Sequence, residues 1–222
     1  MKNISCLLIV VAALVLLPSQ ARAADIAFVA AASAGAASGT LTLTINKPTG
    51  TVQNHVMIAS ISVRPNTPTI TAPSGWTLVR RINNTNSRAS SLAVYYKVAG
   101  ASEGASYAWT FSTSTGSAGG IQTFSGVDTI TPIDVESGQN TASSLNQATP
   151  NVTTTVARTM VVTAHSFATN TTWSAPSGMA EGFDVAGGSS GINGQSIEAN
   201  YVLQTAAGAT GAKRRRPRPM RP

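Results

Sequence analysis

Residues 40–45 read Thr40-Leu41-Thr42-Leu43-Thr44-Ile45, a strict alternation of threonine with an aliphatic residue. Successive side chains of a β-strand point to opposite faces of the sheet. The stretch therefore predicts a strand that buries Leu41, Leu43 and Ile45 and turns its threonines toward water.

The same period of two recurs along the chain. Residues 91–98 place Leu92, Val94, Tyr96 and Val98 on one face, and residues 106–112 place Tyr107, Trp109 and Phe111 on one face. Less regular apolar runs at 56–63 and 160–167 predict central strands buried on both faces. Turn residues separate these runs at 46–50, 65–68, 72–75 and 187–194. Without any helical period of useful length, the chain is typical of an all-β fold, an antiparallel, jelly-roll-like β-sandwich.

An internal repeat organises this pattern. Ala72-Pro73-Ser74-Gly75 recurs as Ala175-Pro176-Ser177-Gly178, an offset of 103 residues, and an apolar run precedes the turn in both places. At an offset of 105 the apolar phase of residues 92–98 falls on residues 197–203, and at 104 Thr40-Leu41 falls on Ser144-Leu145. We interpret the body as two related halves, about 40–126 and 144–211.

Two arrangements fit two such halves: one sandwich to which both contribute strands, or two tandem immunoglobulin-like domains. The segment 127–147 has no hinge composition, and the first half contains few large apolar residues. The sequence therefore favours a single domain over residues 24–211.

The first 23 residues predict a secretory signal peptide. A polar start precedes an apolar run from Cys6 to Leu17, and Ala21-Arg22-Ala23 supplies a cleavage site. The apolar run is too short for a membrane-spanning helix, and no later run is long enough. We expect a secreted, extracellular or cell-envelope protein that has no transmembrane anchor after signal removal. The mature chain would contain no cysteine.

The formal charge of +7 is unevenly distributed. Residues 213–222 hold six of the 15 basic residues, and the signal holds two more. The remaining seven face all eight acidic residues, so the body carries a charge of −1. We expect no nucleic-acid partner for the body, because such partners require a basic surface, and we predict that residues 212–222 are a basic, disordered tail.

The repeat also predicts a strand beginning near Gly211, where the chain instead reads Lys213-Arg214-Arg215-Arg216-Pro217. Unpaired charges in core-facing positions cost several kcal/mol, and proline cannot donate to a β-ladder. We therefore expect no strand there. Two hypotheses explain the run: a polybasic extension that binds phosphate or acidic glycans, or a shifted reading frame that has replaced the last strand.

Three carboxylates, Asp128, Asp134 and Glu136, lie within nine residues of one another. Loop oxygens of this kind can bind Ca²⁺. We expect no cofactor, and calcium at these carboxylates is the alternative. The alternative is that Asp128 begins a turn and that Asp134 and Glu136 lie on a solvent face. The ligand spacing is not regular.

Two tryptophans, Trp76 and Trp173, flank the repeated turn. Exposed aromatic rings beside loops can stack on sugars, whereas a core short of large apolar residues would bury them. The two histidines, His55 and His165, could form a metal site or supply a catalytic base, but no cysteine accompanies them. No catalytic motif occurs, and we predict no catalytic residues.

The segments 72–80, 91–100, 106–112 and 124–129 resemble a β-sandwich module of bacterial secreted and cell-surface proteins. The resemblance covers most of residues 25–211 and implies an extracellular location and a passive role, without known catalytic residues. The basic tail departs from it. We expect a non-catalytic structural or adhesive module whose partners are glycans or other surface proteins. The alternatives are a glycan-binding module that uses Trp76 and Trp173, and a hydrolase with a scattered site.

Overall fold

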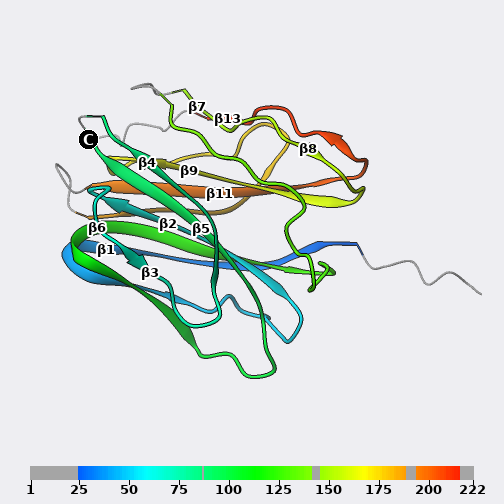
Figure 1. Ribbon diagram of the computed structural model, residues 1–222, viewed down its shortest axis with the longest axis horizontal. Coiled ribbons are helices and arrows are strands. Elements are labelled where there is room, and N and C mark those ends of the chain that lie inside the picture. The colour runs from blue at the N-terminus through cyan, green and yellow to red at the C-terminus, as the bar shows by residue number, and fades with distance from the viewer. Residues whose placement is uncertain (1–24, 87, 142–145, 189–193, 216–222) are drawn as a thin grey trace, which may run out of the picture.

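The computed structural model describes residues 25–86, 88–141, 146–188 and 194–215, which form an all-β, antiparallel structure as predicted (Figure 1). The predicted signal peptide lies outside the described residues. Within them, no helix is long and apolar enough to cross a membrane. The strands of the first half are β1 (Ala27–Asn46), β2 (Val56–Arg64), β3 (Ile70–Thr71), β4 (Thr77–Asn84), β5 (Ser90–Val98) and β6 (Ser106–Ser125). Those of the second half are β7 (Gln147–Ala148), β8 (Thr153–Thr154), β9 (Thr159–Phe167), β10 (Ala180–Gly187), β11 (Gln195–Gln204), β12 (Gly208–Ala209) and β13 (Arg214–Arg215).

The first half forms a six-stranded sheet in the order β1-β6-β2-β5-β4, with β3 paired to β6. The inner part of β6, residues 116–124, pairs with β2. Its outer part pairs with residues 42–46 of β1 and with β3. The outer part brings the Trp109 ring to 6.4 Å from that of Tyr95 on β5. The predicted aromatic face of residues 106–112 is therefore confirmed, because all three of its aromatic side chains are buried in one apolar cluster.

The second half forms a three-stranded sheet in the order β10-β11-β9. It packs on the first sheet, with β10 against β1 and β11 against β6. The apolar cluster between the sheets joins Ala118 of β6 to Phe183, Ile197 and Ala199 of the second sheet. Figure 1 shows β9 and β11 on one side of β1 and β6. This arrangement is consistent with a β-sandwich to which both halves contribute.

The strand order in the second sheet matches part of the first. β4-β5-β2 and β10-β11-β9 are ordered alike, at the offsets that the sequence predicted. The turns before β4 and β10 also match, because Trp76 N–H donates to the Pro73 carbonyl and Met179 N–H donates to the Pro176 carbonyl. The glycine of each turn has a positive φ, 82° at Gly75 and 77° at Gly178, which explains why glycine recurs there.

The basic run contradicts one prediction, because it does form a short strand. Arg214 and Arg215 pair with β7, and Gly208 and Ala209 pair with β8. We expected no strand there, because charges in core-facing positions would be unpaired. Arg215 is instead paired, because its guanidinium donates to the Glu198 carboxylate over an Nε–Oε1 distance of 2.9 Å.

Three other predictions need correction. Leu41 is 55% exposed because the register between β1 and β6 shifts on both sides of Thr40, which breaks the alternation there. The run 160–167 is an edge strand in the described sheet, not a central one, because β9 pairs with β11 alone. In β5 the predicted inward face, which includes Leu92 and Val94, is only half-buried, while Ala93 and Tyr95 on the other face are fully buried.

Candidate functional site

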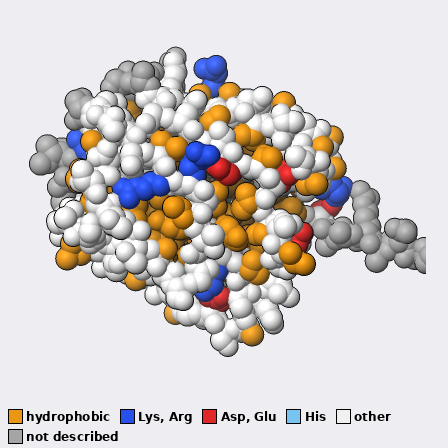
Figure 2. All heavy atoms as spheres, viewed as in Figure 1, with side chains coloured by type: hydrophobic (Ala, Val, Ile, Leu, Met, Phe, Trp, Pro, Cys, Tyr) orange, Lys and Arg blue, Asp and Glu red, His pale blue; other side chains and the backbone are white. Residues whose placement is uncertain are grey.

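A cavity of about 800 Å³ lies between the first sheet, β9 and the segment 126–141. Its floor is the face of β2, β5 and β4 that the three-stranded sheet covers only in part, because Leu92 also packs against the apolar cluster between the sheets. The floor is mostly apolar and includes Ile58, Leu92 and Val94, all half-buried. Apolar atoms also gather in the hollowed middle of the face shown in Figure 2. The size and apolar lining are those of a ligand-binding or peptide-binding site.

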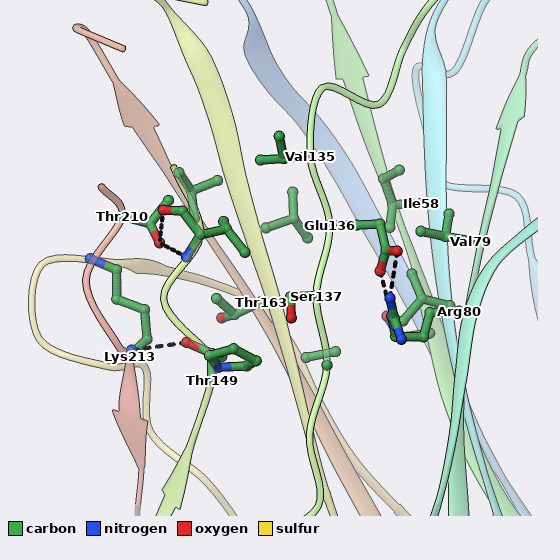
Figure 3. A pocket seen from close by; sticks show the side chains of 18 of the residues that line it. Ile58, Val79, Arg80, Val135, Glu136, Ser137, Thr149, Thr163, Thr210 and Lys213 are labelled. Carbon is green, nitrogen blue, oxygen red and sulfur yellow. Dashed lines mark hydrogen bonds and ion pairs between the residues drawn. The ribbon is translucent and has the colours of Figure 1, made fainter. Parts of the chain in front are cut away.

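One wall of the cavity is the segment 131–141, which lies on β4. The Arg80 guanidinium donates two hydrogen bonds to Glu136, from Nε to Oε2 at 2.5 Å and from Nη2 to Oε1 at 2.7 Å. Asn140 donates to the Asn83 carbonyl at 2.5 Å. Figure 3 shows Glu136 turned toward Arg80, away from the strand that carries Thr163. These contacts hold the segment against β4.

The opposite wall is β9. Its side chains Met160, Val162 and Ala164 line the cavity, and they lie on the face of the second sheet that also carries Ile197, Ala199 and Tyr201. β9 pairs with β11 along one edge, and the part of the chain that the structure describes places no strand on its other edge. A row of backbone donors and acceptors therefore borders an apolar cavity.

The three carboxylates predicted as calcium ligands each have a separate partner. Asp128 accepts hydrogen bonds from the Ile130 N–H and the Thr131 hydroxyl, both at 2.8 Å, which lower its pKa and begin the predicted turn. Asp134 accepts from the hydroxyl and the N–H of Thr155, which lower the Asp134 pKa. The hydrogen bond from Arg80 lowers the pKa of Glu136. The carboxylates therefore do not converge on one point.

The two tryptophans predicted as glycan contacts are buried, at 8% exposure for Trp76 and 5% for Trp173. The Trp76 ring lies 5.2 Å from those of Tyr107 and Trp109. Trp173 donates from Nε1 to the Ser196 hydroxyl at 3.2 Å. Stacking on a sugar requires an exposed ring face. Neither ring offers one, so the two tryptophans form no glycan-stacking surface.

A buried polar cluster covers the outer face of the second sheet. The Glu198 side chain is fully buried, with the His165 imidazole at an Nδ1–Oε1 distance of 3.2 Å and Arg215 on the same oxygen. Burial and the nearby charge of Glu198 raise the pKa of Asp184, the residue paired with Glu198 across β10 and β11. Sequence reasoning singled out His165 but missed Glu198. The sequence held no signal for it, because the offset of 105 aligns Glu198 with Ala93, which alternation places on the outward face and which only the structure shows to be buried.

The two histidines do not form a common site. His55 precedes β2, and its Nδ1 accepts a hydrogen bond from the Val52 N–H. His165 lies in β9 beside Glu198. No group of three or more histidine, cysteine, aspartate or glutamate side chains suited to a metal ion occurs among the residues with described positions.

No family model, curated protein or solved structure matches the chain.

Proposed function

We propose that this chain is a non-catalytic module with a structural or adhesive role, outside the cell or at its surface, and that it acts by binding another polypeptide. The observation that carries this proposal is the apolar cavity beside the edge of β9 on which the described residues place no strand. A contiguous apolar surface bordered by polar groups is typical of protein interaction sites.

The polar groups of the molecule support a passive role. The His165–Glu198 pair resembles the base and orienting acid of a catalytic site. However, the Glu198 carboxylate is paired with Arg215, and the side chains of His165 and Glu198 are both buried. Asp128, Asp134 and Glu136, beside the cavity, are each held by their own hydrogen bonds. The alternative of glycan binding through Trp76 and Trp173 lacks an exposed ring face.

Deleting the gene from the organism that encodes it tests the adhesive role. We expect weaker attachment of cells to one another or to a surface, restored by the parent gene. Val94→Glu places a charge on the cavity floor and should not restore attachment, because burying an unpaired charge on binding is costly. Leu41→Glu, on an exposed part of β1, is the matched control and should restore it. Attachment that is unchanged by the deletion would rule out this role.

A further inference from the structure

We propose that the cavity binds an extended segment of another polypeptide, which adds as an antiparallel strand to the edge of β9 that no described strand covers. This inference rests on the proposed function and names the kind of partner. It follows from comparing the neighbours of β9 with those of β2, the strand that precedes it by 103 residues.

The segment 131–141 occupies the position in the second half that β1 occupies in the first. In β1, a Cβ on Gly35 would lie 2.0 Å from the Ala186 carbonyl oxygen of β10. At an offset of 103, a Cβ on Gly138 would lie 2.9 Å from Arg80 Cδ and 3.0 Å from Ile82 Cγ1, both on β4. Because β4 and β10 correspond, each glycine lies close to the corresponding strand of the other half, Gly35 at the backbone of β10 and Gly138 at side chains of β4.

The strand between these positions differs between the halves. In the first sheet, β6 lies between β1 and β2 and pairs with both. No strand among the described residues pairs with the edge of β9 that borders the cavity. The chain around β7 and β8 also borders the cavity, and it contacts the segment 131–141 where Gln139 donates to the Ala148 carbonyl and the Thr155 N–H donates to Asp134. The inner part of β6 packs on β11 of the other half. Because β11 corresponds to β5, a strand in the cavity would pack on β5. The half-buried Leu92 and Val94 of β5 are the apolar floor that such a strand would cover.

The composition of residues 216–222, which follow β13, is poorly suited to this place. Residues 216–222 read Arg-Pro-Arg-Pro-Met-Arg-Pro. Proline has no N–H to donate to the β9 edge, and arginine in the cavity would bury a charge. A second polypeptide with small or apolar residues at alternate positions meets both requirements. Addition of a strand to an exposed sheet edge is an established mode of peptide recognition, and β6 shows that the strand should run antiparallel to β9.

The probe is a synthetic peptide with the sequence of residues 116–125, Gly-Ser-Ala-Gly-Gly-Ile-Gln-Thr-Phe-Ser, because this strand fills the corresponding place beside β2. Titration into the full chain, followed by calorimetry, should show saturable binding at one site. N-methylation of alternate residues on the edge that faces β9 removes backbone donors and should weaken binding about ten-fold or more. Val94→Glu should weaken it by about 100-fold, while Leu41→Glu should leave it unchanged.

Hydrogen–deuterium exchange separates strand addition from simple filling of the cavity. Bound peptide should slow exchange of backbone amides in β9. The N-methylated peptide leaves the protein unaltered and so controls for misfolding of the Val94→Glu variant. The proposal is overturned by absence of peptide binding, by binding without protection of β9, or by self-association of the chain that the peptide cannot compete with. If the peptide binds but the deletion strain attaches normally, only the adhesive role is overturned. If the deletion strain attaches weakly but the peptide does not bind, only strand addition is overturned.

Discussion

The two halves of this molecule share a strand order but differ in how their sheets are completed. β2 has a neighbour on each edge, whereas β9 has β11 on one edge and a cavity beyond the other. The outer faces differ as well. Trp109, fully buried, covers the face of β5 in the first half, while Arg215 covers the corresponding face of β11 in the second.

This difference shows that one topology can be held by opposite kinds of interaction. In the first half, burial of aromatic and aliphatic side chains supplies the stability. In the second half, Glu198 and Arg215 stand where the first half has apolar residues, and each is acceptable only because the other is present. The paired charges also explain how residues 213–215, which looked unsuited to any strand, become part of the second half.

The largest effect should come from breaking that charge pair. Arg215→Ala leaves the fully buried Glu198 carboxylate without its cationic partner and should lower the free energy of unfolding by about 3 kcal/mol. Urea denaturation at neutral pH measures this change. Arg214→Ala, at an exposed position of the same short strand, is the matched control and should have no measurable effect.

The double variant Glu198→Ala with Arg215→Ala sharpens this prediction. It removes both charges and makes the site resemble Ala93 of the first half, so it should be more stable than Arg215→Ala alone. If Arg215→Ala were as stable as the parent, the basic run would not pack on the second sheet. Arg215 would then not cover β11 as Trp109 covers β5.

A smaller effect should distinguish the two corresponding glycines. Gly35→Ala directs a methyl group at the backbone of β10, 2.0 Å from a carbonyl oxygen that cannot move without the strand, and should cost about 2 kcal/mol. Gly138→Ala meets the side chains of Arg80 and Ile82, which can shift, and should cost less than about 1 kcal/mol. Thermal unfolding of both variants measures the difference.

Gly104→Ala is the control for this pair, because its Cβ would lie 3.5 Å from the nearest atom, an ordinary contact. Equal costs at Gly35 and Gly138 would show that segment 131–141 is held as rigidly as β1. No cost at either position would show that the sheets are not packed as described.

Period-two patterning predicted much of the fold from the sequence, and the offsets of the repeat match the positions of β9, β10 and β11 relative to β2, β4 and β5, although the strand order itself was not predicted. Leu43, Ile45 and the aromatic face of β6 follow directly from alternation. Alternation does not reveal a register shift, so Leu41 was misplaced. It also cannot separate an edge strand from a central one, because β9 owes its edge position to the absence of a partner among the described residues and not to its own composition.

The candidate site was less predictable. The cavity is formed by segments far apart in the sequence, and no local pattern joins Val94 to Val162. The spacing of the acidic residues at 128–136 suggested a shared calcium site, yet each carboxylate accepts hydrogen bonds from a different part of the chain. Glu198 carried no local signal, because its partners His165 and Arg215 are brought to it only by strand pairing and by docking of the basic run.

The smallest effect concerns acid stability, and it should have opposite signs in the two halves. Burial opposes ionisation of Glu103, but hydrogen bonds from Lys97, the Gly100 N–H and Tyr107 outweigh it and lower the Glu103 pKa. The stabilisation from Glu103 is then present above the ordinary value of 4.5 and is lost as the pH falls through the lowered pKa. Burial, with the charge of Glu198, raises the Asp184 pKa. Its ionised form is therefore disfavoured in the fold, and that penalty disappears as the pH falls through the raised pKa toward 3.8.

Urea midpoints of the parent, Glu103→Gln and Asp184→Asn between about pH 3 and pH 7 test these signs. As the pH falls, the parent should lose stability relative to Glu103→Gln, and this loss should develop below about pH 4.5. The parent should gain stability relative to Asp184→Asn, and this gain should develop at higher pH, above the ordinary aspartate value. Asparagine can still accept the hydrogen bond from the Trp173 N–H, so the second variant removes the charge without removing that contact. The parent could instead change stability in the same direction relative to both variants as the pH falls. That result would show that the polar face of the second half does not disfavour charge, and that the contrast between the halves is not electrostatic in origin.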